Sequence, residues 1–586
     1  MTNRSLKMGF RIPCLILFLT GIVYSISYAQ IVQNTADTLQ PKVFTYRGWS
    51  IAVDSEQLDV EELYFNTAIE KAKEYSINTL ELHDFVMKGG IVDALSNYDS
   101  FPKLKNLQSY SYSGKQLSKT DKAKYGERFR SMVAKAQANN ISVNVWYHVL
   151  RDLPSELVKE YPEISDVENG FIWKYLDNSL SEFFQKFPEV DRLTLISLHE
   201  TPSILKNTGK LSREEVLLEL YMTIYKTCKR FGKELIIRDF IVSQIDYETF
   251  WNILDKLPPE IYIMTKSVSA DWSHLDIALN PNMNRYVHKK LIVEFDLYGE
   301  WSGRGDFPVC YPDDIIRHLR ESKACNAMGA MGRLIHDTRP SNQLPFKTIF
   351  DSPMEINVYT FSKYISQPMP WLGETDEKWN EDIEAIDKKY WMQWAKQRYG
   401  EKAGVPIVRA LERTSEINKL TFDIAGLSSR YYVWYPTFFK IHPPGSNKIA
   451  DTWNVFNKQV NMVGINYLRD EKLRALKLAT ESLEDIQSVR GSLSKGNQLL
   501  LESLFKSMLL IIKSYQLALD GYYQVYKSLQ AKNEEGKIST AKALNGLADK
   551  IDEQKGKGWY FNLTSDMRIL AKDILNGKPP ITLLAN

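Results

Sequence analysis

Short runs of β-branched and aromatic residues alternate with longer amphipathic segments along the first two thirds of the chain. Such runs are typical of buried strands, and segments whose apolar positions recur roughly every three to four residues are typical of helices that cover a sheet. The pattern contains eight candidate strands: Val43–Ile51, Thr79–Phe85, Ser142–Leu150, Arg192–Glu200, Glu234–Ile241, Ile261–Val268, Lys290–Leu297 and Ala327–Ile335.

Helical patterns lie between these strands. The candidates are Val60–Tyr75, Ala123–Ala138, Arg213–Phe231 and Asp313–Ala324, and Ser273–Val287 carries the weakest helical pattern. Strands that alternate with crossover helices pair in parallel, and eight such repeats close into a barrel. We therefore predict a (β/α)8 TIM barrel, a fold of the α/β class, over residues 42–375.

The strand signal stops near residue 376, and charged helical patterns follow it. They cover Asp376–Tyr399, Gly404–Asp423, Asn466–Ser492, Asn497–Ala531 and Ile538–Asp552. The aromatic-rich segment Tyr431–Phe439 interrupts them, and we expect it to pack where helices meet or against the barrel. Because 586 residues are too many for one ordinary core, residues 376–586 are predicted to form an α-helical C-terminal domain.

The N-terminus has the parts of a secretory signal. Basic residues precede an apolar run from Ile12, and the small residues Ser27 and Ala29 stand at the −3 and −1 positions of a cleavage site. We predict a signal peptide over residues 1–29, a lead-in over residues 30–41, and an exported protein that is periplasmic or extracellular. No other stretch is apolar enough to span a membrane, so no membrane span is expected in the mature chain.

Composition narrows the classes of partner. The formal net charge is +2, which gives no reason to expect a nucleic-acid partner. The chain has 13 Trp and 32 Tyr, a supply that suits carbohydrate binding because sugar C–H faces pack on flat rings, although composition alone slightly favours large aromatic cores. Three cysteines stay in the mature chain, an odd number that indicates buried thiols more than a disulfide framework. No cofactor is predicted.

Ionisable residues stand at the ends of most predicted strands, and in a barrel of this type the active site lies at the C-terminal strand ends. Such residues are costly to bury without partners, so a set of them indicates function more than structure. Those at the ends of strands two to eight are Glu81, His83, Asp84, His148, His199, Glu200, Arg238, Asp239, Lys266, Asp271, Glu294, Asp296, Glu300, Arg333, His336, Asp337 and Arg339.

Two carboxylates on opposite sides of a barrel mouth are what glycosidic cleavage requires. One donates a proton to the leaving oxygen, and the other activates water or attacks the anomeric carbon. Glu200 and Glu294 fit these roles because strands four and seven face each other across the ring. Strand alternation turns His199 to the opposite face from Glu200, which favours a structural role for His199.

Cations beside these carboxylates indicate that the substrate itself is an anion. Arg238 and Lys266 are the two candidates, and a guanidinium matches a carboxylate with two hydrogen bonds. An equally simple interpretation is that both only neutralise Asp271 and its neighbours. The candidate substrate-binding residues are Arg238, Lys266, Trp272, Tyr298, Trp301, His148, Trp146 and Arg333.

Three segments resemble the α-glucuronidases of glycoside hydrolase family 67. Leu235-Ile-Ile-Arg238-Asp-Phe240 is similar to that family's strand-five "WRAF" stretch, Lys266-Ser-Val-Ser-Ala-Asp271-Trp to its "KNGPIDF", and Leu291-Ile-Val-Glu294-Phe-Asp-Leu-Tyr-Gly299 to its "MEFQITQEYLG". The resemblance covers roughly residues 190–400, and the helical region after the barrel is similar too.

The resemblance implies that Glu200 is the general acid and that Asp271 or Glu294 is the water-activating base, which gives inversion. It implies that Arg238 and Lys266 bind the uronate carboxylate. The chain departs from the family in three respects: Ile196 stands where the family has a lysine four residues before its acid, the loop around the acid is different, and the family's N-terminal β-domain is missing.

Other interpretations of the same residues stay open. A retaining hydrolase would use Glu294 as its nucleophile, and a barrel without catalysis would only bind carbohydrate. A metal-dependent hydrolase is the weaker alternative, because His83, His148 and His336 form no adjacent His-x-His pair, and no metal is predicted. In each case the partner is an oligosaccharide or polysaccharide. The helical domain could build a homodimer or simply cap the barrel.

Overall fold

The structure is a computed structural model of the whole chain, and it describes most residues from 43 to 577. The described ranges are 43–53, 58–84, 90–96, 99–101, 103, 118–150, 155–198, 203–241, 243–268, 278–300, 302–303, 305–337, 344–368, 376–425, 427–428, 440–441, 450–530, 534–555 and 559–577. The predicted leader, the lead-in and the aromatic segment 431–439 lie outside them.

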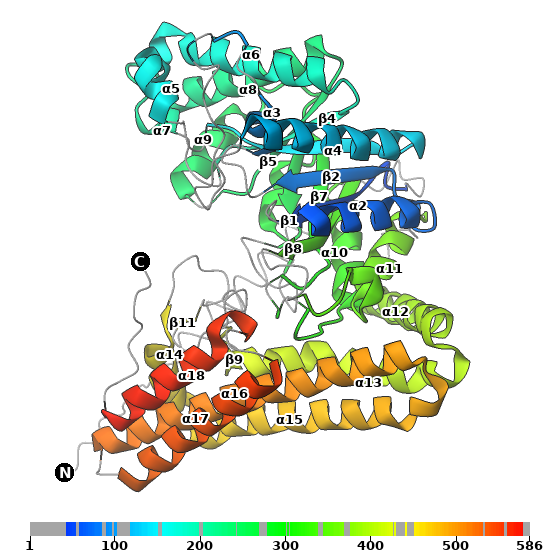
Figure 1. Cartoon of the computed structure of the whole chain (residues 1–586), viewed down its shortest axis with the longest axis vertical. Coiled ribbons are helices and arrows are strands. Elements are labelled where there is room, and N and C mark those ends of the chain that lie inside the picture. The colour runs from blue at the N-terminus through cyan, green and yellow to red at the C-terminus, as the bar shows by residue number, and fades with distance from the viewer. Residues whose placement is uncertain are drawn as a thin grey trace, which may run out of the picture.

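Eight parallel strands close into a barrel in chain order, as predicted (Figure 1). Each strand pairs with its neighbours in sequence, and β1 also pairs with β8. Strands β2 to β7 end one to four residues before the predicted bounds, whereas β1 and β8 end two residues after them. Their bounds are β1 Tyr46–Val53, β2 Thr79–Asp84, β3 Ser142–His148, β4 Arg192–Ile196, β5 Glu234–Arg238, β6 Tyr262–Lys266, β7 Lys290–Asp296 and β8 Gly329–Asp337.

Helices cover the outside of the barrel. They begin where the sequence supplies caps: at α8, Ser212 accepts the backbone N–H of Glu215 while the Glu215 carboxylate accepts that of Ser212. The bounds are α2 Leu58–Ala72, α3 Gly90–Leu95, α4 Lys119–Ala138, α5 Ser155–Glu160, α6 Phe171–Lys186, α7 Ser203–Lys206, α8 Arg213–Arg230, α9 Gln244–Leu254, α10 Pro312–Ala324 and α11 Glu355–Ile365.

The connection between β6 and β7 differs from the prediction. In its described part, Ser273–Val287 contains only the 3-10 helix Pro281–Arg285. Asn280 and Pro281 explain this, because the Asn280 side chain accepts the N–H of Asn282 and begins a short turn. Several helices were not predicted from the sequence, including α14 and α18 in the C-terminal region.

The barrel interior changes character along its axis. Near the N-terminal strand ends it is filled by an apolar cluster separate from the main core: Tyr46, Ile236, Tyr262, Met264, Ile292 and Met331. Because side chains alternate between the two faces of a strand, the next inward positions are Arg238, Lys266, Glu294 and Arg333. The inner wall therefore turns from apolar to charged over one alternation step toward the C-terminal ends.

The chain after the barrel is almost entirely helical, and long helices lie side by side below the barrel in Figure 1. Two short antiparallel pairs, Asp423–Ile424 with Leu427–Ser428 and Lys440–Ile441 with Ala450–Asp451, interrupt it. The helices are α12 Asp376–Tyr399, α13 Glu401–Phe422, α14 Thr452–Val463, α15 Ile465–Ser488, α16 Lys495–Gln530, α17 Glu534–Lys555 and α18 Trp559–Leu575.

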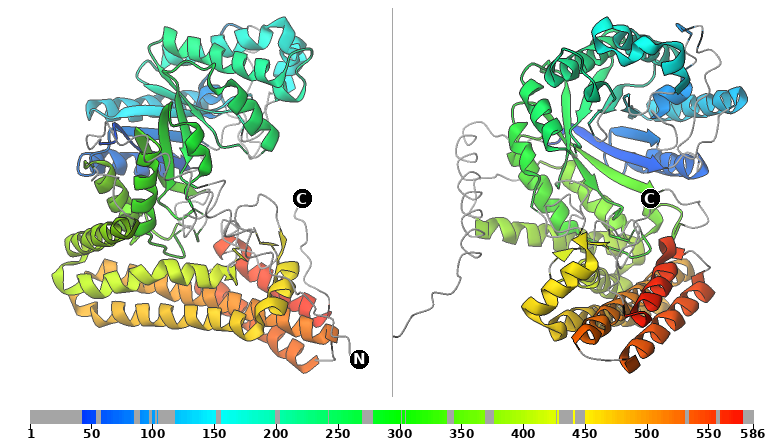
Figure 2. Two further views of the ribbon diagram at one scale, coloured as in Figure 1. Left: turned by 180° about the vertical axis from the view of Figure 1, so that it is seen from behind. Right: turned by 90° about the vertical axis from the view of Figure 1, so that its left-hand side faces the viewer.

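The helical region contacts the barrel through α12 and α13, which lie between the barrel and the other C-terminal helices (Figures 1 and 2). On α13, Thr414 accepts the backbone N–H of Cys310 at 2.9 Å and Asn418 donates to the Ser302 carbonyl at 3.0 Å. Both partners belong to the loop that follows β7. The helical region therefore supports a loop at the C-terminal end of the barrel.

Cys228, Cys310 and Cys325 are buried free thiols. Packing around them, which excludes water, raises the pKa of each thiol above its usual range. Among the described helices, none is both long enough and apolar enough to cross a bilayer.

Candidate active site

Charged side chains from β5 to β8 meet inside the barrel at its C-terminal end, which we call the mouth. The strand register brings them together: Lys266 of β6 pairs with Glu294 of β7, and Asp296 of β7 pairs with Arg333 of β8. Register partners in a sheet point to the same face. The mouth therefore holds cations and carboxylates in adjacent positions.

Glu294 lies at the centre of this arrangement and is 3% exposed. Arg238 binds it with two hydrogen bonds, Nε to Oε2 at 2.5 Å and Nη2 to Oε1 at 2.9 Å. Arg333 adds a third bond, Nη2 to Oε1 at 2.6 Å. Burial alone would raise the pKa of Glu294, but the two guanidiniums outweigh it and hold this pKa well below its usual range. Glu294 is therefore an ionised carboxylate and a poor proton donor.

Arg333 connects Glu294 to a second buried carboxylate. Its Nη1 donates to Oε2 of Glu300 at 3.1 Å, and His336 Nδ1 contacts Oε1 of the same group. Burial opposes ionisation of Glu300, but His336 and Arg333 lower its pKa to about 2. Glu300 comes from the loop after β7, so this ion-pair network joins the loop to the strand ends of the barrel.

An aromatic and imidazole cluster from β2 and β3 meets these cations. The Trp146 ring lies 4.9 Å from the Arg238 guanidinium carbon and 5.4 Å from that of Arg333, distances typical of cation–π contacts. His83 packs on the same indole at 3.5 Å between ring centroids, and its Nε2 is 3.0 Å from Nε2 of His148. One of the two imidazoles must donate this hydrogen bond and the other must accept it.

His83 is neutral in this setting. Burial lowers its pKa, and the neighbouring His148 and Arg333 lower it further, to well below its usual range. His83 therefore adds a hydrogen-bonding group to the mouth but no positive charge at neutral pH.

Lys266 is the most exposed of the inward cations. It is partly exposed, whereas Arg238 and Arg333 are 4% and 3% exposed. Its Nζ lies 4.6 Å from the centroid of the Phe240 ring, which also packs on Arg238 at 4.8 Å. A cation held beside an aromatic face with access to solvent is suited to contact an anionic group of a ligand.

Asp296 ends β7 two positions beyond Glu294 on the same face. Its carboxylate accepts the backbone N–H of Tyr298 at 2.9 Å and of Glu300 at 2.6 Å, which shapes the loop. The surrounding packing raises its pKa, and the charge of Glu300 raises it further, to about 7. Asp296 is therefore a group of the mouth that titrates near neutral pH.

The loop that carries Glu300 depends on a glycine. Gly299 has φ of +71°, and a Cβ there would lie 2.8 Å from Val309 Cγ1. Only glycine adopts this conformation without strain in that space. The glycine, the Asp296 hydrogen bonds and the contacts with α13 together hold Glu300 against Arg333.

The structure brings together six of the predicted site residues: Trp146, His148, Arg238, Lys266, Glu294 and Arg333. Tyr298 is fully buried, and its ring packs edge-on against Phe346 at 6.1 Å, so it belongs to the core beside the loop. The predictions for Glu200, Asp271, Trp272 and Trp301 fall outside the described residues.

Four further groups line the mouth: His83, Asp296, Glu300 and His336. The sequence placed them at strand ends, but they were not assigned a catalytic or substrate-binding role. Alternation along β2 and β7 could have directed His83 and Asp296 to the mouth, because they share a face with Glu81 and Glu294. Glu300 lies beyond the strand, where alternation no longer predicts direction. Within the described part of the chain, no group of three or more His, Cys, Asp or Glu side chains could hold a metal ion.

No protein-family model and no curated protein matches the chain significantly. Solved structures resemble its fold. One is described as a GH138 enzyme targeting pectin rhamnogalacturonan II, and it has a TM-score of 0.58 and 13% identity over 89% of this chain and 63% of that one. This chain thus spans less than two thirds of that structure. A mutant of the Thermobaculum terrenum O-GlcNAc hydrolase has a TM-score of 0.43 and 12% identity over 91% and 95%.

The first of these likenesses supports the barrel fold followed by helices, and at 13% identity it establishes the fold alone. That structure is described as a GH138 enzyme and not as a member of family 67. The family 67 resemblance therefore stays a prediction, and only the fold that it implies, a (β/α)8 barrel followed by helices, is supported.

Proposed function

We propose that this protein is an exported glycoside hydrolase that cleaves a uronate-bearing oligosaccharide, with an α-glucuronidase-like activity. One observation carries the proposal: an ionised carboxylate, Glu294, is fixed by Arg238 and Arg333 at the C-terminal end of a barrel. Glycosidic cleavage needs an ionised carboxylate as base or nucleophile beside the anomeric carbon, and Glu294 is such a group. The site buries several charges, and this burial costs stability. Such a cost is expected where the charges are needed for catalysis.

The proton donor must be a different group, because the pKa of Glu294 is too low for that role. We propose Glu200. In the chain Glu200 follows β4, which ends at Ile196, so it belongs to a connection at the C-terminal ends of the strands, the end at which Glu294 lies.

The role of the second carboxylate depends on whether the enzyme inverts or retains configuration at the anomeric carbon. A carboxylate bound by two arginines is a weak base, which favours Asp271 as the group that activates water if the enzyme inverts. If the enzyme retains configuration, Glu294 is the nucleophile and Asp271 is not required. Anomeric NMR of the first product separates these alternatives.

The uronate preference rests on Lys266. Lys266 is partly exposed next to Glu294, whereas Arg238 and Arg333 are buried, so Lys266 is the cation that a ligand reaches first. A substrate carboxylate beside Lys266 would also lie near the two guanidiniums. The pectin-targeting fold neighbour is compatible with an acidic glycan, but the charges of the mouth carry the argument.

The test is hydrolysis of uronate-bearing oligosaccharides against neutral ones of the same length. Lys266→Met is expected to raise KM for the uronate substrate by about 10- to 100-fold, the range for one lost charged hydrogen bond, with little effect on a neutral substrate. Lys290→Met is the matched control, because Lys290 lies at the other end of the adjacent strand β7.

Glu200→Gln should remove most of the turnover of the uronate substrate. Unchanged sugar release by folded Glu200→Gln would contradict its role as the acid. Tight glycan binding without turnover across the panel would instead indicate a carbohydrate-binding barrel.

A further inference from the structure

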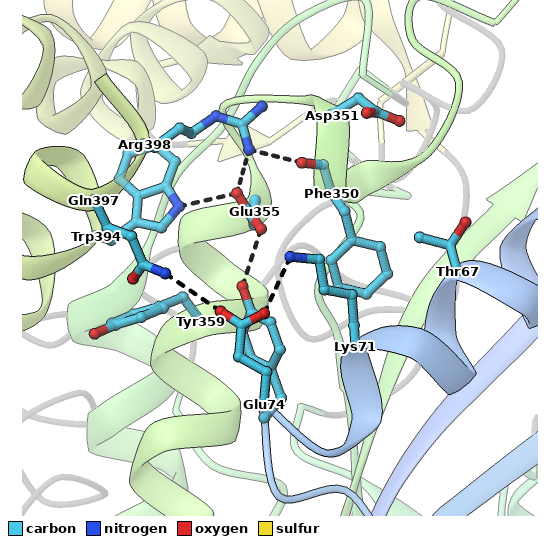
Figure 3. Close-up of a pocket in the computed structure, with 11 residues that line it drawn as sticks. Thr67, Lys71, Glu74, Phe350, Asp351, Glu355, Tyr359, Trp394, Gln397 and Arg398 are labelled. Carbon is cyan, nitrogen blue, oxygen red and sulfur yellow. Dashed lines mark hydrogen bonds and ion pairs between the residues drawn. The ribbon is translucent and has the colours of Figure 1, made fainter. Parts of the chain in front are cut away.

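A cavity of about 340 Å³ lies outside the barrel, between α2, α11 and α12, and we call it the junction pocket (Figure 3). Its volume is within the range of small-ligand sites. Eleven residues line it, and none of them belongs to the mouth. The walls include the rings of Tyr75, Phe350, Tyr359 and Trp394, which come from three different parts of the chain.

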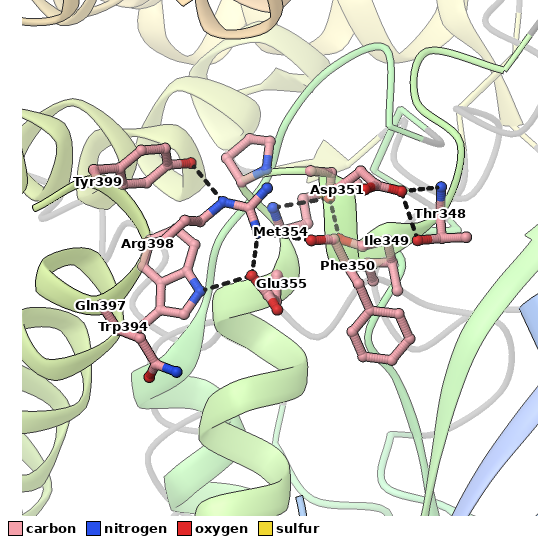
Figure 4. A network of polar contacts seen from close by, with 12 residues as sticks. Thr348, Ile349, Phe350, Asp351, Met354, Glu355, Trp394, Gln397, Arg398 and Tyr399 are labelled. Carbon is pink, nitrogen blue, oxygen red and sulfur yellow. Dashed lines mark hydrogen bonds and ion pairs between the residues drawn. The ribbon is translucent and has the colours of Figure 1, made fainter. Parts of the chain in front are cut away.

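The floor of the pocket is a fixed polar network (Figure 4). Glu355 is 6% exposed and accepts hydrogen bonds from Tyr75 Oη at 2.9 Å and Trp394 Nε1 at 3.2 Å. Arg398 pairs with Glu355 and also donates to the Phe350 carbonyl at 2.6 Å. These bonds hold the aromatic walls in place, so the site is preorganised.

The rim consists of exposed groups with weak bonds. Lys71 and Glu74 form a surface ion pair at 3.1 Å, and Gln397 donates to Glu74 at 3.3 Å. Asp351 uses Oδ2 to accept from the backbone and hydroxyl of Thr348. Surface pairs of this kind contribute at most about 1 kcal/mol, so a ligand can replace them readily.

The charges of the lining select among ligand classes. The lining contains three carboxylates (Glu74, Asp351 and Glu355) and two cations, Lys71 and Arg398. An anionic ligand would be repelled, and an apolar one would leave charged groups without solvent. A ligand whose groups both donate and accept can bond to the lysine and amide as well as to the carboxylates, and hydroxyl groups do this.

We propose that the junction pocket binds a neutral sugar residue, with its hydroxyls on the polar rim and its C–H face against the aromatic wall. This site is separate from the proposed active site and differs from it in charge preference. It would hold an uncharged part of a glycan outside the barrel, whereas the mouth would take an acidic residue.

The test is saturation-transfer NMR with glucose, galactose, xylose and arabinose on the full chain; these free monosaccharides have no glycosidic bond to cleave, so turnover does not interfere. Thr67→Phe places a ring in the pocket from α2, and Glu70→Phe places the same ring on an exposed position of the same helix. We expect saturation transfer to at least one neutral sugar, at least about tenfold weaker binding in Thr67→Phe, and unchanged binding in Glu70→Phe.

Absence of transfer to every sugar, or transfer that is equal in Thr67→Phe and Glu70→Phe, would overturn the proposal and leave the pocket as a structural joint. If Thr67→Phe does not fold, Gln397→Ala decides: weakened binding supports the site, and unchanged binding refutes it. The outcome is independent of the active site, because hydrolysis without pocket binding refutes only the pocket, and pocket binding without hydrolysis refutes only the proposed activity.

Discussion

Glu294 and Glu355 are both buried carboxylates paired with arginine, yet their surroundings differ. Glu294 accepts hydrogen bonds from two guanidiniums, with Lys266 beside it and Glu300 and Asp296 nearby. Glu355 receives one guanidinium and two neutral donors, the Tyr75 hydroxyl and the Trp394 indole. Glu294 is thus surrounded by several charged groups, whereas Glu355 belongs to a hydrogen-bonded network around one ion pair.

The difference separates the proposed active site from a network that attaches one element to another. Fastening α12 to the barrel needs one satisfied pair, because each additional buried charge costs desolvation. The mouth buries several charges that no packing need explains, and its pKa values spread from well below the usual range at Glu294 to about 7 at Asp296. Carboxyls whose environments push their pKa values apart are typical of acid–base sites.

The largest expected effect is on turnover. Glu294→Gln keeps the shape of the side chain but removes its charge, so it should lower kcat by about a thousandfold or more, as loss of a principal catalytic group does in other hydrolases. Glu81→Gln is the matched control, because Glu81 is also buried inside the barrel and its pKa is raised by burial. We expect that variant to retain activity within about tenfold. Equal losses of kcat in the two variants would mean that any change inside the barrel lowers activity, and would contradict a specific role for Glu294.

The second effect is on stability at the junction. Arg398→Ala leaves Glu355 buried without its cation, so the free energy of unfolding should fall by about 3–5 kcal/mol in urea denaturation. The folded fraction should keep its specific activity. Arg409→Ala breaks the surface pair with Asp485 and should cost less than about 1 kcal/mol. Similar midpoints for the two variants would contradict the view that the Glu355 network fastens the helices.

The same contrast explains how much could be read from the sequence. The barrel, its eight strands and the inward direction of Arg238, Glu294 and Arg333 follow from alternation, which is local. The pairing of both arginines with Glu294 does not, because it depends on the barrel's closure and register. Glu300 was named at the end of strand seven, but its contact with Arg333 could not be predicted, because the loop geometry at Gly299 directs its side chain. The Glu355 network was missed because its bonded partners lie up to 280 residues apart, on α11, on α12 and in the turn after α2.

The smallest effect concerns pH. Asp296 has a pKa raised to about 7, so it is neutral in mild acid and ionised in mild base. A uronate substrate is ionised throughout, and the charge that Asp296 gains as pH rises should repel it. KM for a uronate substrate should therefore increase by roughly two- to fivefold from below to above neutral pH, as expected for a screened contact worth under about 1 kcal/mol. Steady-state kinetics across this range measures the change.

Asp296→Asn tests the cause of that change. Asparagine keeps one carbonyl oxygen for the loop hydrogen bonds but cannot ionise, so its KM should stay at the low-pH value. Glu300 does not compete as the titrating group, because its pKa of about 2 lies far below the range, and His83 stays neutral there because its pKa is also far below it. A pH dependence that survives in Asp296→Asn would point to another group such as Asp239, whose pKa burial raises to about 6. A pH dependence seen equally with neutral substrates would contradict the charge repulsion.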